Sequence, residues 1–377
     1  MPTNLPAEAK SKWKKAMDAK TPEEKLQALQ EFLSAVPKHK GTERLRMQVT
    51  RQIAALRREI ELKRKKKVGG GEQFFVEKEG DIQVVVLGYP GPGREAVFRC
   101  ITGIEVTDSK KPVPGMKTWE GVYFQIISAP PLFGDASSQS RLMALARNAD
   151  AIILALDMVP GVESQVKALL DALEESRIAW KKPRASVEIE RRSTGGVVVI
   201  GELEGTTLQD VAALLRDYGI YHAVVKVTGK ATLDDVEEAL FGEIAYKPTI
   251  VVLYSPGDHI QDAEVMRGTL ESEFGIPVHL IKGCETIDFG RMAEYIFREL
   301  DLIRVYTRNP RTGEVEERPI VVRRGAKVIE VARIIHSQLG ESFKYAWVWS
   351  NRFTFNPRKV GKDFELGDGD IIQIAGG

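Results

Sequence analysis

A glycine-containing loop between a predicted strand and a predicted helix is the segment with the clearest chemical signature. The strand-like run 83–87 leads into residues 88–95, where Gly88 and Gly93 have the spacing of the phosphate-binding pattern G-x-x-x-x-G-K-[ST]. In such a loop successive backbone N–H groups bind phosphates, a lysine reaches the outer phosphates, and a hydroxyl coordinates Mg²⁺. The glycine spacing therefore indicates a loop with the frame of a phosphate-binding site.

The other residues of this loop depart from the pattern. Pro92 lacks a backbone N–H, Glu95 replaces the hydroxyl, and Arg94 alone retains a positive charge. A Glu95 carboxylate about 4 Å from a phosphate would be repelled by roughly 4 kcal/mol at an effective dielectric constant near 20, which is about a thousandfold in affinity. Two alternatives for Glu95 stay open: its side chain turns away from the phosphate position, or it binds Mg²⁺ itself. The loop as a whole has a simpler alternative too, because glycine-proline turns also connect strands to helices without binding a ligand.

The elements around this loop indicate an α/β architecture. Buried strand-like runs at 83–87, 151–156 and 249–254 alternate with helical stretches, which favours a parallel sheet. Residues 180–243 interrupt this series and are predicted to form a small α/β insert. Its predicted elements are strands 197–200 and 223–227 and helices 207–218 and 232–239.

The N-terminal region is predicted to be helical. Thr21 and Glu24 form a capping-box pattern with Pro22 between them, and apolar residues then recur at helical spacing. A second periodic run follows and predicts a helix hairpin. It ends in a basic run before three glycines at 69–71 that read as a linker, and the basic residues are Lys63, Arg64, Lys65, Lys66 and Lys67.

The segment from Leu302 onward predicts a second small module. Strands are expected at 303–307, 320–322, 345–349 and 371–374, with a helix over 327–339, and this order suggests a β-grasp fold. The alternation of Tyr345, Trp347 and Trp349 favours packing in the core on one face of its sheet, whereas Phe353 and Phe355 are better surface candidates.

Composition bounds the class of protein. The 377 residues are 43% hydrophobic and 28% charged with a net charge of +1, which is typical of a globular protein of several domains. Cys100 and Cys284 are the only cysteines, so we expect no disulfide framework, no cysteine-based metal site and a reducing cytoplasm. No apolar run reaches the roughly 18 residues of a membrane helix, and His222, His259, His279 and His336 have no metal-binding spacing.

Several segments resemble the developmentally regulated GTP-binding (DRG, Obg-type) proteins. The C-terminal runs 343–349, 357–361 and 370–374 look like the TGS domain of that family, and residues 37–43 resemble the N-terminal helical region of its archaeal members. The resemblance covers nearly the whole chain and implies a P-loop GTPase-like sheet with a ubiquitin-like β-grasp domain. The implied division is an N-terminal helical domain 1–72, a G domain in two parts, 73–179 and 244–301, an insert 180–243 and a TGS domain 302–377.

The nucleotide motifs of the family are altered where the resemblance places them. The D-x-x-G switch falls on 128–131, where Ser128, Pro130 and Pro131 supply neither the magnesium aspartate nor the γ-phosphate glycine. The guanine-reading N-K-x-D falls on 255–258, where Asp258 alone remains. The S-A loop corresponds to 282–284, and the first switch offers only Thr107 as a candidate magnesium ligand.

The resemblance therefore implies a pseudo-GTPase scaffold with no catalytic residue and no bound cofactor. The rival interpretation is weak GTP binding with Mg²⁺ through Gly88, Gly93, Arg94 and Asp258. In that case the chain would be a slow GTPase with an unusual magnesium site at Glu95. Isothermal titration with GTP and Mg²⁺ separates these interpretations.

Basic residues beside aromatic residues suit an RNA surface. The family is linked to the ribosome, so the resemblance implies a cytoplasmic partner such as the ribosome or ribosomal RNA, with a ribosomal or accessory protein as a further partner and no membrane. A scaffold that never contacts RNA remains the third alternative. In addition to the basic run at 63–67, the candidate RNA-binding residues are Arg323, Arg324, Lys344, Arg352, Arg358 and Lys359.

Overall fold

The structure is a computed structural model in which the chain divides into two compact units. It describes residues 6–19, 21–38, 42–66, 75–106, 110–132, 136–159, 161–242, 244–255 and 260–376. The first unit comprises Met1–Phe74, Phe133–Arg147 and Glu163–Lys247, and the second comprises Phe75–Leu132, Asn148–Val162 and Pro248–Gly377. Among the described residues, no helix combines the length and the apolar character needed to cross a membrane.

The first unit begins with three helices, α1 (Ala7–Asp18), α2 (Pro22–Ala35) and α3 (Glu43–Lys66). The predicted capping box is present at α2, because the Thr21 hydroxyl accepts the Glu24 N–H and the Glu24 carboxylate accepts the Thr21 N–H. Trp13 is 1% exposed and packs against Phe32 of α2 at 5.1 Å between ring centroids. These aromatic contacts fix the helices to one another.

The insert of the first unit is a sheet with two helices. The strands β6 (Ala185–Arg191), β7 (Val197–Leu203) and β8 (Ala223–Ala231) lie in the order β6-β8-β7, with helices α7 (Leu208–Asp217) and α8 (Leu233–Ala239). Strand β6 was missed because its alternating charged residues lack a continuous apolar run. The same unit contains α5 (Ala136–Asn148), α6 (Val162–Glu175) and the short parallel pair β5 (Ile178–Ala179) and β9 (Ala245–Tyr246).

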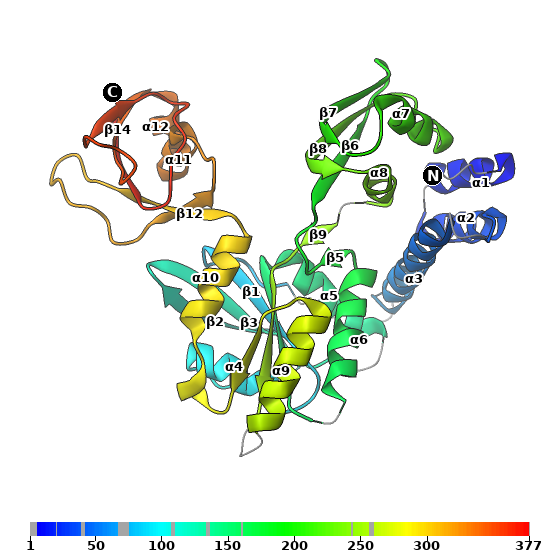
Figure 1. Cartoon of the computed structure of the whole chain (residues 1–377), viewed down its shortest axis with the longest axis horizontal. Helices are drawn as coiled ribbons and strands as arrows, with labels where there is room; N and C mark the ends of the chain where they lie inside the picture. Colours follow the sequence, from blue (N-terminus) through cyan, green and yellow to red (C-terminus); the bar gives the residue numbers. More distant parts are fainter. Residues whose placement is uncertain are drawn as a thin grey trace. The chain divides into compact units, whose positions relative to one another are not determined.

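The second unit is built on a six-stranded sheet of order β11-β10-β4-β1-β3-β2, of which β1, β2 and β3 are labelled in Figure 1. All neighbours are parallel except β2 and β3, which confirms the predicted parallel α/β sheet. The strands are β1 (Ile82–Leu87), β2 (Val113–Trp119), β3 (Val122–Ser128), β4 (Ala151–Asp157), β10 (Thr249–Tyr254) and β11 (Val278–Ile281). Helices α4 (Pro92–Thr102), α9 (Ile260–Phe274) and α10 (Phe289–Glu299) belong to it.

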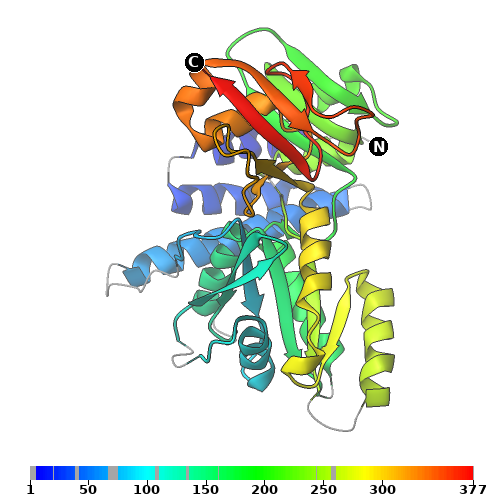
Figure 2. The same cartoon turned by 90° about the vertical axis from the view of Figure 1, so that its left-hand side faces the viewer.

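The C-terminal part of this unit is a β-grasp sheet of order β13-β12-β16-β14-β15 (Figure 2, with β16 in red at the C-terminus). Its elements are β12 (Leu302–Thr307), β13 (Ile320–Arg323), α11 (Val328–Ile335), α12 (Ser337–Glu341), β14 (Phe343–Trp349), β15 (Arg358–Val360) and β16 (Asp370–Gly376). The predicted helix over 327–339 is broken at His336, whose backbone is extended.

The orientation of the aromatic residues on β14 differs from the prediction. Ala346 and Val348 are fully buried in the core under α11, so Tyr345, Trp347 and Trp349 lie on the opposite face and remain partly exposed. The alternation was recognised, but the small residues rather than the large ones face the core, because the space between sheet and helix is filled by aliphatic side chains.

The two phenylalanines of the following loop separate as well. Phe353 packs against the β-grasp core and contacts Phe364 at 5.9 Å between ring centroids, so its assignment to the surface was wrong. Phe355 is 86% exposed, as predicted.

Candidate functional site

The glycine-containing loop connects β1 to α4 and lies against the end of β4. Gly91 must be a glycine here, because a β-carbon on it would overlap the Asp157 Oδ2 atom. A β-carbon on Gly93 would lie 3.0 Å from Asp157 Oδ1 and 3.1 Å from the Tyr254 Cβ atom. The glycines therefore permit close approach of a protein carboxylate to the loop.

Asp157 takes one of the backbone donors of this loop. Its Oδ1 atom accepts the Gly93 N–H at 2.9 Å, a donor that the phosphate-loop pattern would direct to a phosphate. Burial raises the pKa of Asp157, and the hydrogen bond from Gly93 opposes that shift. Sequence reasoning did not select Asp157. The available signal was its position directly after the buried run 151–156, since carboxyl ends of parallel strands meet at one edge of a sheet.

Arg94 points into the protein. Its side chain is 2% exposed, and Nη1 donates to Ser128 Oγ at 2.8 Å and to the Ala129 carbonyl at 2.5 Å. Nη2 forms an ion pair with Glu95 at 3.0 Å. Burial lowers the pKa of Arg94 and the Glu95 carboxylate opposes this shift. The only cation of the loop is thus engaged by β3 and by its own neighbour.

The segment that corresponds to the D-x-x-G switch, residues 128–131, supplies groups that Arg94 contacts. Ser128 ends β3 and is 1% exposed, and Pro130 and Pro131 are buried after it. The Ala129 N–H donates to the Val86 carbonyl at 3.1 Å. Instead of presenting magnesium and γ-phosphate ligands, this segment supplies acceptors to Arg94.

Two other residues from the sequence interpretation cannot be placed. Asp258 and Thr107 lie outside the described residues. Glu95 is described, and its side chain is 44% exposed. Within the described part of the chain, no group of three or more histidine, cysteine, aspartate or glutamate residues could hold a metal ion.

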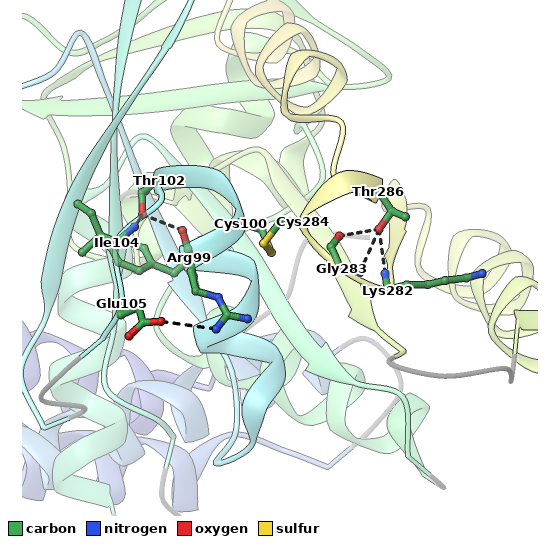
Figure 3. The surroundings of a disulfide bond; sticks show 10 residues. Arg99, Cys100, Thr102, Ile104, Glu105, Lys282, Gly283, Cys284 and Thr286 are labelled. Atoms are coloured by element: carbon green, nitrogen blue, oxygen red, sulfur yellow. Dashed lines mark hydrogen bonds and ion pairs between the residues drawn. A yellow bond between two sulfur atoms is a disulfide. The ribbon is translucent and has the colours of Figure 1, made fainter.

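A disulfide joins two elements near the loop. Cys100 of α4 and Cys284 of the 3-10 helix η2 (Cys284–Thr286) have their Sγ atoms 2.11 Å and their Cα atoms 4.5 Å apart (Figure 3). The expectation of no disulfide was wrong, because the fold brings together cysteines that are 184 positions apart in the sequence. Thr286 stabilises η2 by accepting the Lys282 N–H at 2.9 Å. Cysteine usage therefore no longer supports a reducing compartment.

The candidate RNA-binding residues fall into three groups. Lys63, Arg64, Lys65 and Lys66 lie in α3, but their side chains and all of Lys67 are outside the described residues. Arg352 forms a 2.5 Å ion pair with the buried Asp370, and Arg324 forms one with Asp301 at 3.1 Å. The remaining four are exposed on the β-grasp module and have no such carboxylate partner among the described residues: Arg323, Lys344, Arg358 and Lys359.

The fold and the loop define a P-loop GTPase-like protein with a C-terminal β-grasp domain. The TGS domain family matches residues 303–375, and the C-terminal region of the MMR_HSR1 domain matches residues 194–302. These matches cover most of the insert, the part of the chain between the insert and the β-grasp module, and that module itself.

Curated relatives extend the similarity to nearly the whole chain. An uncharacterized GTP-binding protein of Methanocaldococcus jannaschii is 26% identical over 93% of this chain and 92% of its own length. Developmentally-regulated GTP-binding protein 2 of Homo sapiens is 26% identical over 93% of this chain and 98% of its own length. The homologue of the latter in Dictyostelium discoideum is 27% identical with the same coverage.

Among solved structures, the Schizosaccharomyces pombe YchF GTPase covers 81% of this chain and all of its own length, at 12% identity and a TM-score of 0.46. The sequence relatives are GTP-binding proteins by name. This chain is a homologue of the DRG, Obg-type GTP-binding proteins that carry a TGS domain, and archaeal proteins are among its relatives.

Proposed function

We propose that this chain is a non-catalytic factor of the DRG type, in which the GTPase-like sheet is a scaffold and the TGS domain contacts RNA of the ribosome. It would act in the cytoplasm without a bound nucleotide. Ribosomal RNA is the proposed main partner, and a ribosomal or accessory protein is a further one. The relatives described above are GTP-binding proteins by name, so the proposal concerns what this chain has lost and what it retains.

One observation carries the proposal of a scaffold. The loop that would hold phosphates has its Gly93 N–H bonded to Asp157 and its single cation, Arg94, buried against Ser128 and Ala129. A phosphate arriving at this loop would meet the Asp157 carboxylate, and the loop's own cation, Arg94, is already engaged by other groups. Binding would require both side chains to rearrange and buried hydrogen bonds to break.

The proposal of an RNA partner is supported by surface chemistry. Arg323, Lys344, Arg358 and Lys359 are exposed on one small domain. Phosphates of RNA are bound through such cations with release of counterions, and this binding weakens as salt rises. The resemblance to the DRG family, which is linked to the ribosome, suggests that this RNA is ribosomal RNA.

Two experiments test the two parts separately. Isothermal titration of the full chain with GTP and Mg²⁺ is expected to give no saturable heat, and tight magnesium-dependent binding would overturn the scaffold proposal. Sucrose-gradient fractionation at low salt is expected to show the chain migrating with ribosomes, and its absence from ribosomal fractions would overturn the partner proposal.

The slow GTPase remains the alternative outcome of the first experiment. Glu95 favours it, because its half-exposed carboxylate is in the first turn of α4 and could contact a metal ion. In that case phosphate release would exceed that of an Arg94→Ala variant. Equal release by both proteins would eliminate the alternative.

A further inference from the structure

The outer face of the β-grasp sheet carries a row of aromatic side chains. Because Ala346 and Val348 fill the core under α11, the alternating residues Tyr345, Trp347 and Trp349 all project from the opposite face of β14. Residues two apart on a strand are about 7 Å apart. The three rings therefore form a line along one strand, and each keeps part of its surface exposed.

Two cations lie over rings of this row. The Lys359 Nζ atom is 4.0 Å from the centroid of the Tyr345 ring, and the Arg308 guanidinium carbon is 4.7 Å from that of Trp349. Lys359 of β15 and Gln373 of β16 are the cross-strand partners of Trp347. Arg308 also donates to Gln373 Oε1 at 3.0 Å. We call the set Tyr345, Trp347, Trp349, Arg308, Lys359 and Gln373 the aromatic face.

The cations of the aromatic face have no acidic partner among the residues that the structure describes. In the described part of the chain, neither Lys359 nor Arg308 is within ion-pair distance of a carboxylate. Arg304, on the same side of the sheet in β12, differs, since it pairs with Asp368 and stacks at 5.6 Å over Trp119 of β2. Arg304 at β12 is thus engaged in contacts within the protein, whereas the aromatic face presents exposed rings and positive charges that are not paired with described carboxylates.

We propose that the aromatic face binds single-stranded RNA, with unpaired bases stacking on the rings and Lys359 and Arg308 contacting the phosphates. The proposal rests on the RNA partner named above and specifies its form and its site. Splayed bases stack on aromatic side chains, and Gln373 can accept from or donate to a base edge. A duplex is excluded from such contacts because its bases are already stacked and paired.

The test uses the full chain and fluorescein-labelled ten-nucleotide oligoadenylate, oligouridylate and a duplex of the same length. Fluorescence anisotropy at low salt is expected to show tighter binding of both single strands than of the duplex. Trp347→Ala is expected to weaken single-strand binding about 5- to 150-fold, the range for loss of one base stack. Lys359→Gln is expected to lower the salt dependence of log affinity by about 0.7, the share of one phosphate contact.

Phe355→Ala is the matched control. Its ring is 86% exposed but lies outside the aromatic face, so its loss is expected to leave affinity unchanged. Trp347→Leu removes the ring but keeps a large apolar side chain, and it is expected to lose single-strand binding as Trp347→Ala does. Circular dichroism of each variant checks that it is folded. Equal affinity for duplex and single strand, or unchanged single-strand binding by folded Trp347 variants, would overturn the proposal.

Ribosome co-sedimentation separates this inference from the proposed function. If wild type migrates with ribosomes but shows no stacking-dependent binding of single strands, only this inference fails and the proposed function stands. If neither assay shows binding, both fail. Loss of single-strand binding in Trp347→Ala, with no change in Phe355→Ala, supports it.

Discussion

Asp157→Ala is the variant that most directly tests the interpretation of the phosphate loop. The substitution removes the carboxylate that accepts the Gly93 N–H at 2.9 Å and frees that donor. A phosphate oxygen bound by the same N–H would lie close to Asp157. Two unit charges about 4 Å apart repel by roughly 4 kcal/mol at an effective dielectric constant of 20 and by about 1 kcal/mol in water.

Because Asp157 is only partly buried, we expect a result between these limits. Asp157→Ala should bind inorganic pyrophosphate about 5- to 1000-fold more tightly than the wild type, measured by isothermal titration without and with Mg²⁺. Asp150→Ala is the matched control, since Asp150 precedes the opposite end of β4, where it pairs with Lys78 at 2.7 Å.

Two results would refute this reasoning. If wild type binds pyrophosphate as tightly as Asp157→Ala does, the Asp157 carboxylate does not oppose an anion at the loop. If Asp150→Ala gains the same affinity, the effect comes from net charge and not from the hydrogen bond to Gly93.

Three further predictions concern stability, each measured by urea denaturation. Burial raises the pKa of Asp157, so its contribution to stability is fully present below the unfolded pKa of about 3.9 and is lost as pH rises through the folded pKa. Asp157→Asn should therefore gain stability relative to wild type as pH rises. A stability difference that stays constant with pH would contradict this. Arg94→Met should lower the free energy of unfolding by about 2–4 kcal/mol through lost buried hydrogen bonds, whereas Arg99→Met, 51% exposed, should change it little. Cys100→Ser should cost about 5 kcal/mol without reductant, from the entropy of closing so long a loop, and the difference should disappear in dithiothreitol.

The local elements were largely predictable from the sequence. The capping box at Thr21, the buried runs of β1, β4 and β10, and the glycine spacing after β1 each depend on residues close in the chain. Strand β6 was the exception. Val187 and Ile189 alternate with polar residues, as in a half-buried strand, but two apolar residues in so short a run are a weak signal. Such a strand makes few contacts with residues near it in sequence. Its structure therefore depends on its pairing with β8.

The candidate site was predictable in position but not in chemistry. Sequence spacing located Gly88, Gly93, Arg94 and Glu95, yet which way Arg94 points depends on Ser128 and Ala129 at the end of another strand. Asp157 was not selected, because its position at the end of a buried strand marks the edge of the sheet but does not show that its carboxylate accepts the Gly93 N–H.

By itself, the sequence determined what is local: helices from apolar periodicity and caps, strands from buried runs, and the loop from its glycines. The tertiary structure alone decided which groups meet. It paired Asp157 with Gly93, joined Cys100 to Cys284 and turned Trp347 away from the core. The physical reason is that hydrogen bonds, disulfides and packing act between atoms a few ångströms apart, and only the folded chain brings distant residues to that distance.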